Sequence, residues 1–135
     1  MGHMNTMHST LLASAATLAL AACNAITEDK LKLADAQHWL HEACGVQLAQ
    51  PMQLQSGSWM KASGSQGWHT RVTGNLHIGT DEVDELVKQL RANTGLHQRG
   101  ANATHYSFES LYSDHAERSC EIDAPTGRFY FQYVD

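Results

Sequence analysis

Residues 68–78 constrain the fold more than any other stretch, because their side chains alternate between two kinds. One parity is mostly apolar and comprises Trp68, Thr70, Val72, Leu76 and Ile78. The other parity is polar and comprises His69, Arg71, Thr73, Asn75 and His77. A two-residue period over this length predicts a strand with one buried and one solvated face. We expect Gly74 to mark a β-bulge in it.

Two helices are predicted, one before this strand in the sequence and one after it. Within residues 28–44, apolar side chains recur at steps of three and four, and Gly45 suits a helix C-terminus. A second helix is expected to begin at a cap formed by Thr80 or Asp81 and to end at Gly95. Its buried stripe comprises Val83, Leu86, Val87 and Leu90.

The remaining segments complete the fold class. Further strands are expected over residues 52–62, from Tyr106 to Tyr112, around Cys120 and Ile122, and over residues 128–134. We expect residues 96–103 to form a loop. The resulting order is α-β-β-α-β-β-β, with turns between sequential strands. It predicts an α+β fold in which two helices pack on one face of a mainly antiparallel sheet.

Charge marks off the N-terminal segment, because every Asp, Glu, Lys and Arg lies after position 23. Residues 11–22 are small or apolar, a length that suits a signal-peptide core and is too short to span a bilayer. We expect residues 1–22 to be an expression scar (Met1-Gly2-His3) followed by a signal peptide. Residues 23–28 would then form a tether, and residues 29–135 a single α+β domain.

The apolar core ends in Leu20-Ala21-Ala22-Cys23, which resembles the lipobox of bacterial lipoproteins. In that family the leader is cleaved before the cysteine, and the cysteine is acylated. The resemblance therefore implies a cell-envelope protein held at the membrane by lipid. Asn24 in place of Asp implies the outer membrane and a periplasm-facing domain. One feature departs from the pattern, since no Lys or Arg precedes the core. The alternative is an ordinary N-terminal helix with Cys23 as an incidental thiol.

The other two cysteines also fit a protein of the cell envelope. With Cys23 assigned to lipid, Cys44 and Cys120 remain as an even pair. In an oxidising envelope these two are expected to form a disulfide. The alternative is a pair of separate buried thiols, as in a cytosolic protein.

Two groups of residues resemble chemical sites without predicting one. His38, His41 and Glu42 are close neighbours on the first predicted helix. Their order is not that of the His-Glu-x-x-His zinc motif, and the spacing supplies no third ligand, so we expect solvated side chains and no metal. Ser113-Asp114-His115 holds the residue types of a hydrolase triad. Adjacency in sequence does not predict a triad, because triad members meet in space.

The candidate recognition surface combines the polar parity of residues 68–78 with two tryptophans that flank a Ser- and Gly-rich turn. Rigid aromatic anchors beside a turn are common in binding surfaces. The alternatives are an ordinary solvated face and tryptophans that cap the sheet edge. The predicted partner-binding residues are Trp59, Trp68, His69, Arg71, Asn75 and His77.

Composition narrows the function. A net charge of −5 disfavours nucleic-acid binding. The sequence holds no phosphate loop, nucleophile elbow or Cys-x-x-Cys motif. We expect a non-catalytic protein without a cofactor that binds a protein partner at the envelope. In size and address it resembles the immunity and inhibitor proteins that bacteria direct against envelope-attacking enzymes. The alternatives are an envelope enzyme or metal-binding protein that uses surface histidines, and a scaffolding lipoprotein.

Overall fold

The computed structural model describes residues 26–48, 52–63, 67–102, 104–110 and 116–135. The predicted signal peptide, Cys23 of the lipobox, Tyr112 and Ser113-Asp114-His115 lie outside the described residues. No helix among the described residues is long and apolar enough to cross a membrane.

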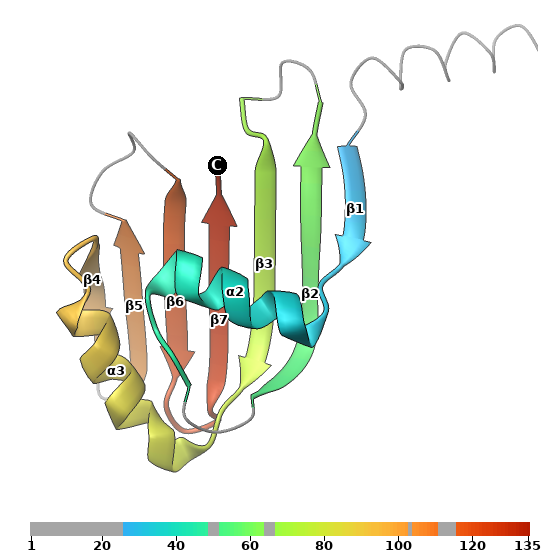
Figure 1. The fold of residues 1–135 in the computed structure, drawn as a ribbon. Helices are drawn as coiled ribbons and strands as arrows, with labels where there is room; N and C mark the ends of the chain where they lie inside the picture. The colour runs from blue at the N-terminus through green and yellow to red at the C-terminus, as the bar shows by residue number, and fades with distance from the viewer. Residues whose placement is uncertain (1–25, 49–51, 64–66, 103, 111–115) are drawn as a thin grey trace, which may run out of the picture.

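One antiparallel sheet of seven strands forms the body of the protein, in the order β1-β2-β3-β7-β6-β5-β4 (Figure 1). The strands are β1 Ile26–Lys30, β2 Gln53–Ala62, β3 Thr70–His77, β4 Leu96–Ala101, β5 His105–Ser110, β6 Glu117–Asp123 and β7 Arg128–Val134. The helices are α2 Leu33–Cys44 and α3 Val83–Ala92, the latter preceded by the 3-10 turn η1 Thr80–Glu82. The α+β class predicted from the sequence is confirmed.

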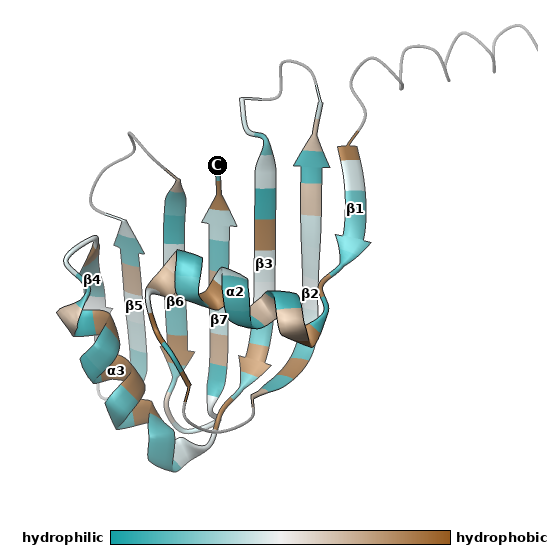
Figure 2. Cartoon of the chain, in the orientation of Figure 1, coloured by the Kyte–Doolittle hydropathy of each residue, from teal (hydrophilic) through white to brown (hydrophobic). Residues whose placement is uncertain are grey.

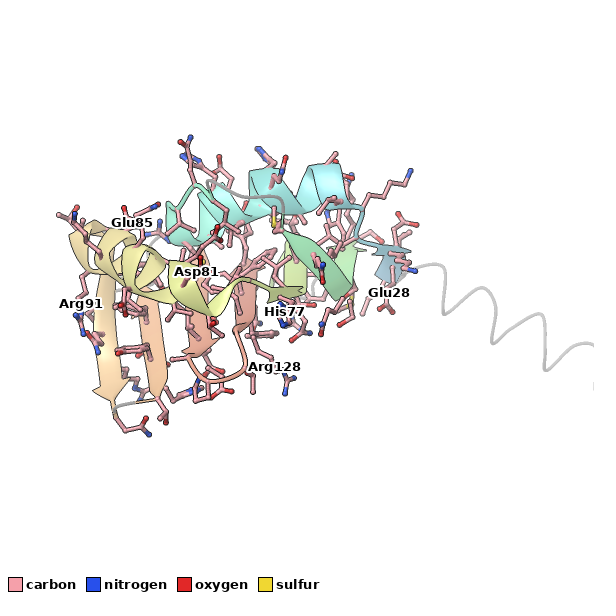
Figure 3. The ribbon with its side chains drawn as sticks, turned by 90° about the horizontal axis from the view of Figure 1, so that it is seen from below. Glu28, His77, Asp81, Glu85, Arg91 and Arg128 are labelled. Atoms are coloured by element: carbon pink, nitrogen blue, oxygen red, sulfur yellow. A yellow bond between two sulfur atoms is a disulfide. The ribbon has the colours of Figure 1, made fainter. Side chains whose placement is uncertain are left out.

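Both helices lie on the same side of the sheet in Figure 1, and the view from below in Figure 3 agrees. Helix α2 crosses the strands and contacts β7, β6 and β2, whereas α3 contacts β4. The opposite side of the sheet, which we call the open face, carries no helix from the described residues. The fold therefore divides each central strand into a covered side and an open side.

The hydrophobic core fills the space between the helices and the sheet. Alternate residues of the strands enter it, and Figure 2 shows the resulting bands of apolar and polar residues. The core side chains of β3, β7 and β6 are Val72, Leu76, Phe129, Phe131, Cys120 and Ile122. The apolar stripe of α3 is buried as predicted, and it comprises Val83, Leu86, Val87 and Leu90. The predicted two-sided strand is thus confirmed over β3.

Gly74 has a role in this core different from the predicted one. It pairs in regular register with Gly57 and Phe131, and the irregularity in this part of the sheet lies in β2, between Leu54 and Ser56. A Cβ atom at Gly74 would lie 2.3 Å from the Phe131 ring. Glycine at this position therefore makes room for the ring, and the predicted bulge there is wrong.

A disulfide joins Cys44, the last residue of α2, to Cys120 in the middle of β6. The two Cα atoms are 6.3 Å apart and both residues are fully buried. The bond ties α2 to the centre of the sheet, so the predicted cysteine pairing is confirmed.

Two strands were not expected from the sequence. Residues 26–30, assigned to the tether and the first helical turn, form the edge strand β1, and the helix begins at Leu33 instead of Glu28. Residues 96–101, assigned to a loop, form the opposite edge strand β4. Every residue of β1 is exposed, and the strand lies at the edge of the sheet. Such a strand lacks the apolar alternation that reveals central strands.

The helix ends were predicted in part. Gly45 adopts the left-handed conformation with φ of 68°, which confirms it as the stop of α2. The predicted cap at Thr80 or Asp81 is wrong, because no side chain caps η1 or α3. Helix α3 ends at Ala92, before Gly95. The Asn93 side chain then donates to the carbonyl oxygen of Cys44 at 2.9 Å and so links the ends of the two helices.

Candidate functional site

The open face presents polar side chains in four rows across β3, β7 and β6. Strand register sets the rows, because residues paired across an antiparallel ladder point to the same side. From one end to the other the rows are Arg71–Val134–Glu117, Thr73–Gln132–Ser119, Asn75–Tyr130–Glu121 and His77–Arg128–Asp123. Figure 3 shows Arg128 on the side of the sheet opposite Asp81 and Glu85 of the helical layer. The consecutive strands β6 and β7 and the distant strand β3 thus build one surface.

Arg71 is held in place on this surface by an aromatic ring. Its guanidinium carbon lies 4.7 Å from the centre of the Trp68 ring, a geometry typical of cation–π contacts. The Arg71 Nε atom is buried and has no hydrogen-bond partner among the described residues. The ring contact therefore pre-positions the side chain on the open face.

Tyr130 occupies the middle of the open face and responds to charges on both neighbouring strands. Burial raises its pKa, the Glu121 carboxylate raises the pKa further, and the Arg71 guanidinium lowers it. The Tyr130 hydroxyl donates to Oε1 of Gln132 at 3.3 Å. The phenol therefore stays protonated at neutral pH and can take part in hydrogen bonds to a bound partner.

Two shallow depressions lie beside this central column. One, of about 290 Å³, is lined by Asn75, His105, Glu121, Asp123, Arg128 and Tyr130. The other, of about 480 Å³, is lined by Glu109, Ser110, Glu117, Arg118, Ser119, Gln132 and Val134. Both are only partly enclosed. Their lining side chains are mostly polar or charged, whereas small-molecule pockets are lined mainly by apolar side chains.

Acidic side chains follow β6 on the open face, at Glu117, Glu121 and Asp123. Within the described residues, the ion pairs closer than 4.0 Å are those that Glu109 makes with His97 and Arg99. The β6 carboxylates and the Arg71 guanidinium are therefore unneutralised by close pairing in this part of the chain. Their charges remain available to a partner.

The structure brings together some of the predicted partner-binding residues and separates others. Arg71, Asn75 and His77 lie on the open face, and His69 lies at the end of the sheet, where its backbone N–H donates to the carbonyl oxygen of Asp135. Trp68 precedes β3 and stacks under Arg71, although the alternation placed it with Val72 on the buried parity. A bend before the strand breaks the two-residue period there.

Trp59 lies on the covered side, opposite Val72 in the register. Its ring centre is 5.9 Å from that of Trp39 on α2, and Trp39 lies 5.0 Å from Tyr133. The Lys61 Nζ atom lies over the Trp59 ring, 4.8 Å from its centre. Trp59 therefore belongs to an aromatic cluster that packs α2 on the sheet, and the two tryptophans do not form one anchor pair.

The sequence analysis missed the contribution of β6 and β7. Tyr130, Glu121 and Gln132 were not among the predicted binding residues, yet they occupy the centre of the surface. One signal for them is present in the sequence. Polar residues alternate with Cys120 and Ile122 in β6 and with Phe129 and Phe131 in β7.

The histidines considered as metal ligands, and expected to be solvated, lie elsewhere. His38, His41 and Glu42 are exposed on α2, and His38 packs edge-on against Trp39 with ring centres 5.1 Å apart. Among the described residues, no three His, Cys, Asp or Glu side chains are grouped closely enough to hold a metal ion.

Comparison of the chain with protein-family models, with curated proteins and with solved structures gives no match.

Proposed function

We propose that this protein is a non-catalytic binding protein of the bacterial cell envelope, anchored by lipid at Cys23, whose open face binds a protein partner. The partner would be an enzyme that attacks the envelope, and the protein would act as its immunity or inhibitor protein. The observation that carries the proposal is that three neighbouring strands place Arg71, Tyr130 and Glu121 on one helix-free face.

The chemistry of that face supports a protein partner. Arginine, tyrosine and tryptophan supply a large share of binding energy at protein interfaces, and Arg71, Tyr130 and Trp68 lie together there. A polar sheet surface with partly enclosed, polar depressions gives a protein partner many contacts. The exposed carboxylates of β6 would steer a basic partner toward it.

The envelope address rests on the lipobox and on the buried Cys44–Cys120 disulfide. Disulfides of this kind persist in oxidising compartments such as the periplasm. The address is tested by expressing the full chain and its Cys23→Ser variant in bacteria with labelled palmitate. We expect label and membrane association for the natural sequence, and neither for Cys23→Ser. Equal membrane association of both chains without label would contradict the lipid anchor.

Binding is tested by capture from envelope and secreted fractions with the full chain as bait. Three baits are compared: the natural sequence, Arg71→Ala combined with Tyr130→Ala, and the control Lys88→Ala on α3. The proposal requires a stoichiometric partner that the natural and Lys88→Ala baits retain and the double variant loses. The purified protein should also inhibit that partner's hydrolytic activity. A partner retained equally by all three baits would place binding elsewhere.

A further inference from the structure

The open face carries Arg71 on one side of β7 and carboxylates on the other, so a second copy can place opposite charges against each other. Strand β7 lies between β3, which carries Arg71 and His77, and β6, which carries Glu117 and Asp123. A two-fold axis along β7, in the plane between two facing sheets, places β3 of one copy over β6 of the other. Position along the strands is unchanged by this rotation, so each row of one copy meets the same row of the other.

In this arrangement each polar row of one copy faces the same row of the other copy. Arg71 of each copy faces Glu117 of the other, Asn75 faces Glu121, and His77 faces Asp123. Facing sheets pack about 10 Å apart and cross at about 30°. The long side chains of Arg71 and Glu117 can span the offset that this crossing introduces at the end of the strands.

The charged groups concerned are not already paired. Among the described residues, neither Arg71 nor Glu117 has an ion-pair partner within 4.0 Å, and Glu117 is exposed. Trp68 already orders the Arg71 side chain, which lowers the entropy lost when a carboxylate binds. The axis also brings the two Arg128 side chains together, with Asp123 beside each in its own copy. Charge thus favours the contact at the Arg71–Glu117 end and weakens it at the other end, where the two Arg128 side chains meet.

The area of the face is close to the size that a dimer needs. Six inter-strand spacings of about 4.8 Å and eight residues of about 3.3 Å give about 760 Å² from each copy. Specific interfaces bury about 800 Å² per partner, so a contact over nearly the whole open face approaches that class. Because the surface is polar, the affinity is expected to be moderate and to depend on salt.

We propose that two copies of this protein associate face to face through their open faces, about a two-fold axis along β7. The dimer covers Arg71 and Tyr130, and so masks the face assigned above to a partner. In that respect it rests on the proposed function, but self-association is measured without any partner. Failure of the dimer would leave the capture experiment intact, and failure of the capture would leave the dimer intact.

The test is sedimentation equilibrium of the full chain over a concentration series at low and high salt, in a Cys23→Ser background that prevents cross-linking through that thiol. We expect a concentration-dependent dimer that weakens with salt. Arg71→Glu and Glu117→Arg should each raise the dimer dissociation constant about tenfold or more. The control Lys88→Glu on α3 should leave it unchanged.

The proposed two-fold arrangement makes a prediction that other modes of association do not make. An equimolar mixture of Arg71→Glu and Glu117→Arg chains should form a heterodimer, because both facing pairs are then of opposite charge. His77→Glu mixed with Asp123→Arg gives an independent test at the other end of the axis, should a variant of the first pair fail to fold. A natural chain that remains monomeric at all concentrations would overturn the proposal. So would folded single variants whose mixtures stay monomeric, or a Lys88→Glu change as damaging as Arg71→Glu.

Discussion

The two sides of the sheet are made by the same strands and differ in almost every physical property. The covered side holds the buried apolar residues and the disulfide, and no polar or charged residue is buried among the described residues. The open side holds Arg71, Tyr130 and the β6 carboxylates. Residues one position apart therefore have different roles. Stability is expected to depend on one parity and recognition on the other.

The largest difference in the effect of substitution on stability is expected between two consecutive residues of β7. Phe131 is fully buried against Gly74, and Phe131→Ala should lower the free energy of unfolding by about 3–5 kcal/mol, because a cavity remains. Its neighbour Gln132 points to the open face, so Gln132→Ala should change stability by about 0.5 kcal/mol or less. Urea unfolding of both variants measures the contrast. Equal losses would show that the two sides are not independent.

Loss of the disulfide is the next effect. Cys44 and Cys120 are 76 residues apart, and replacing both with Ala should cost up to about 4 kcal/mol through the greater freedom of the unfolded chain. Thermal unfolding of the natural chain with and without reductant provides the matched control. Unchanged unfolding under full reduction would mean that packing alone holds α2 on β6.

A smaller loss is expected at the glycine that faces the core. Gly74→Ala places a Cβ atom against the Phe131 ring, and overpacking of this kind costs about 1–3 kcal/mol. Gly100→Ala in the edge strand β4 is the control, because nothing lies within 4 Å of its added Cβ. Chemical unfolding compares the two. If Gly100→Ala were the more damaging, the close approach at Gly74 would not matter for stability.

The smallest effect concerns the open face and pH. The pKa of Tyr130 is raised above 10.0 in the folded chain, so its contribution to stability is present below the unfolded pKa. That contribution is lost as the pH rises from the unfolded pKa through the higher folded one. Glu121→Gln removes one cause and should lower the pKa of Tyr130, whereas Arg71→Ala should raise it further.

Ultraviolet titration of tyrosinate, with Tyr130→Phe subtracted, measures this pKa. Glu42→Gln is the control, because Glu42 acts on Tyr133 rather than on Tyr130. Equal shifts from Glu121→Gln and Glu42→Gln would show that the open face does not respond as a separate surface.

The central elements of the fold were predictable because each carries a complete local pattern. Strand β3 alternates in full, α3 has an apolar stripe, and Gly45 ends α2 as expected. The edge strands β1 and β4 lack such a pattern. Strand β1 is exposed throughout, and its backbone hydrogen bonds to β2 determine its structure. The pairing continues just after the strand, where the Leu31 N–H donates to the carbonyl oxygen of Gly57 at 3.1 Å.

The candidate site was predictable only along one strand. Arg71, Asn75 and His77 share a parity that the sequence displays, so their common face could be inferred. The grouping of Trp59 with Trp68 failed because the bend before Thr70 changes the direction of Trp68, while strand pairing holds Trp59 on the covered side. The two-residue period predicts which side of the sheet a residue faces within one strand. It does not predict the side of residues beyond a bend or a turn.

The sequence by itself determined which residues of each central strand and of α3 are buried, because hydrophobic period acts over neighbouring residues. The turn at residues 123–127 predicted β7 beside β6, whereas the pairing of β7 with β3 was decided by the tertiary structure alone. That arrangement brings Arg71, Tyr130 and Glu121 onto one surface, and it sets Arg71 in the row of Glu117. Strand order and register depend on backbone pairing between distant segments and on the packing of the two helices, neither of which is written in local pattern.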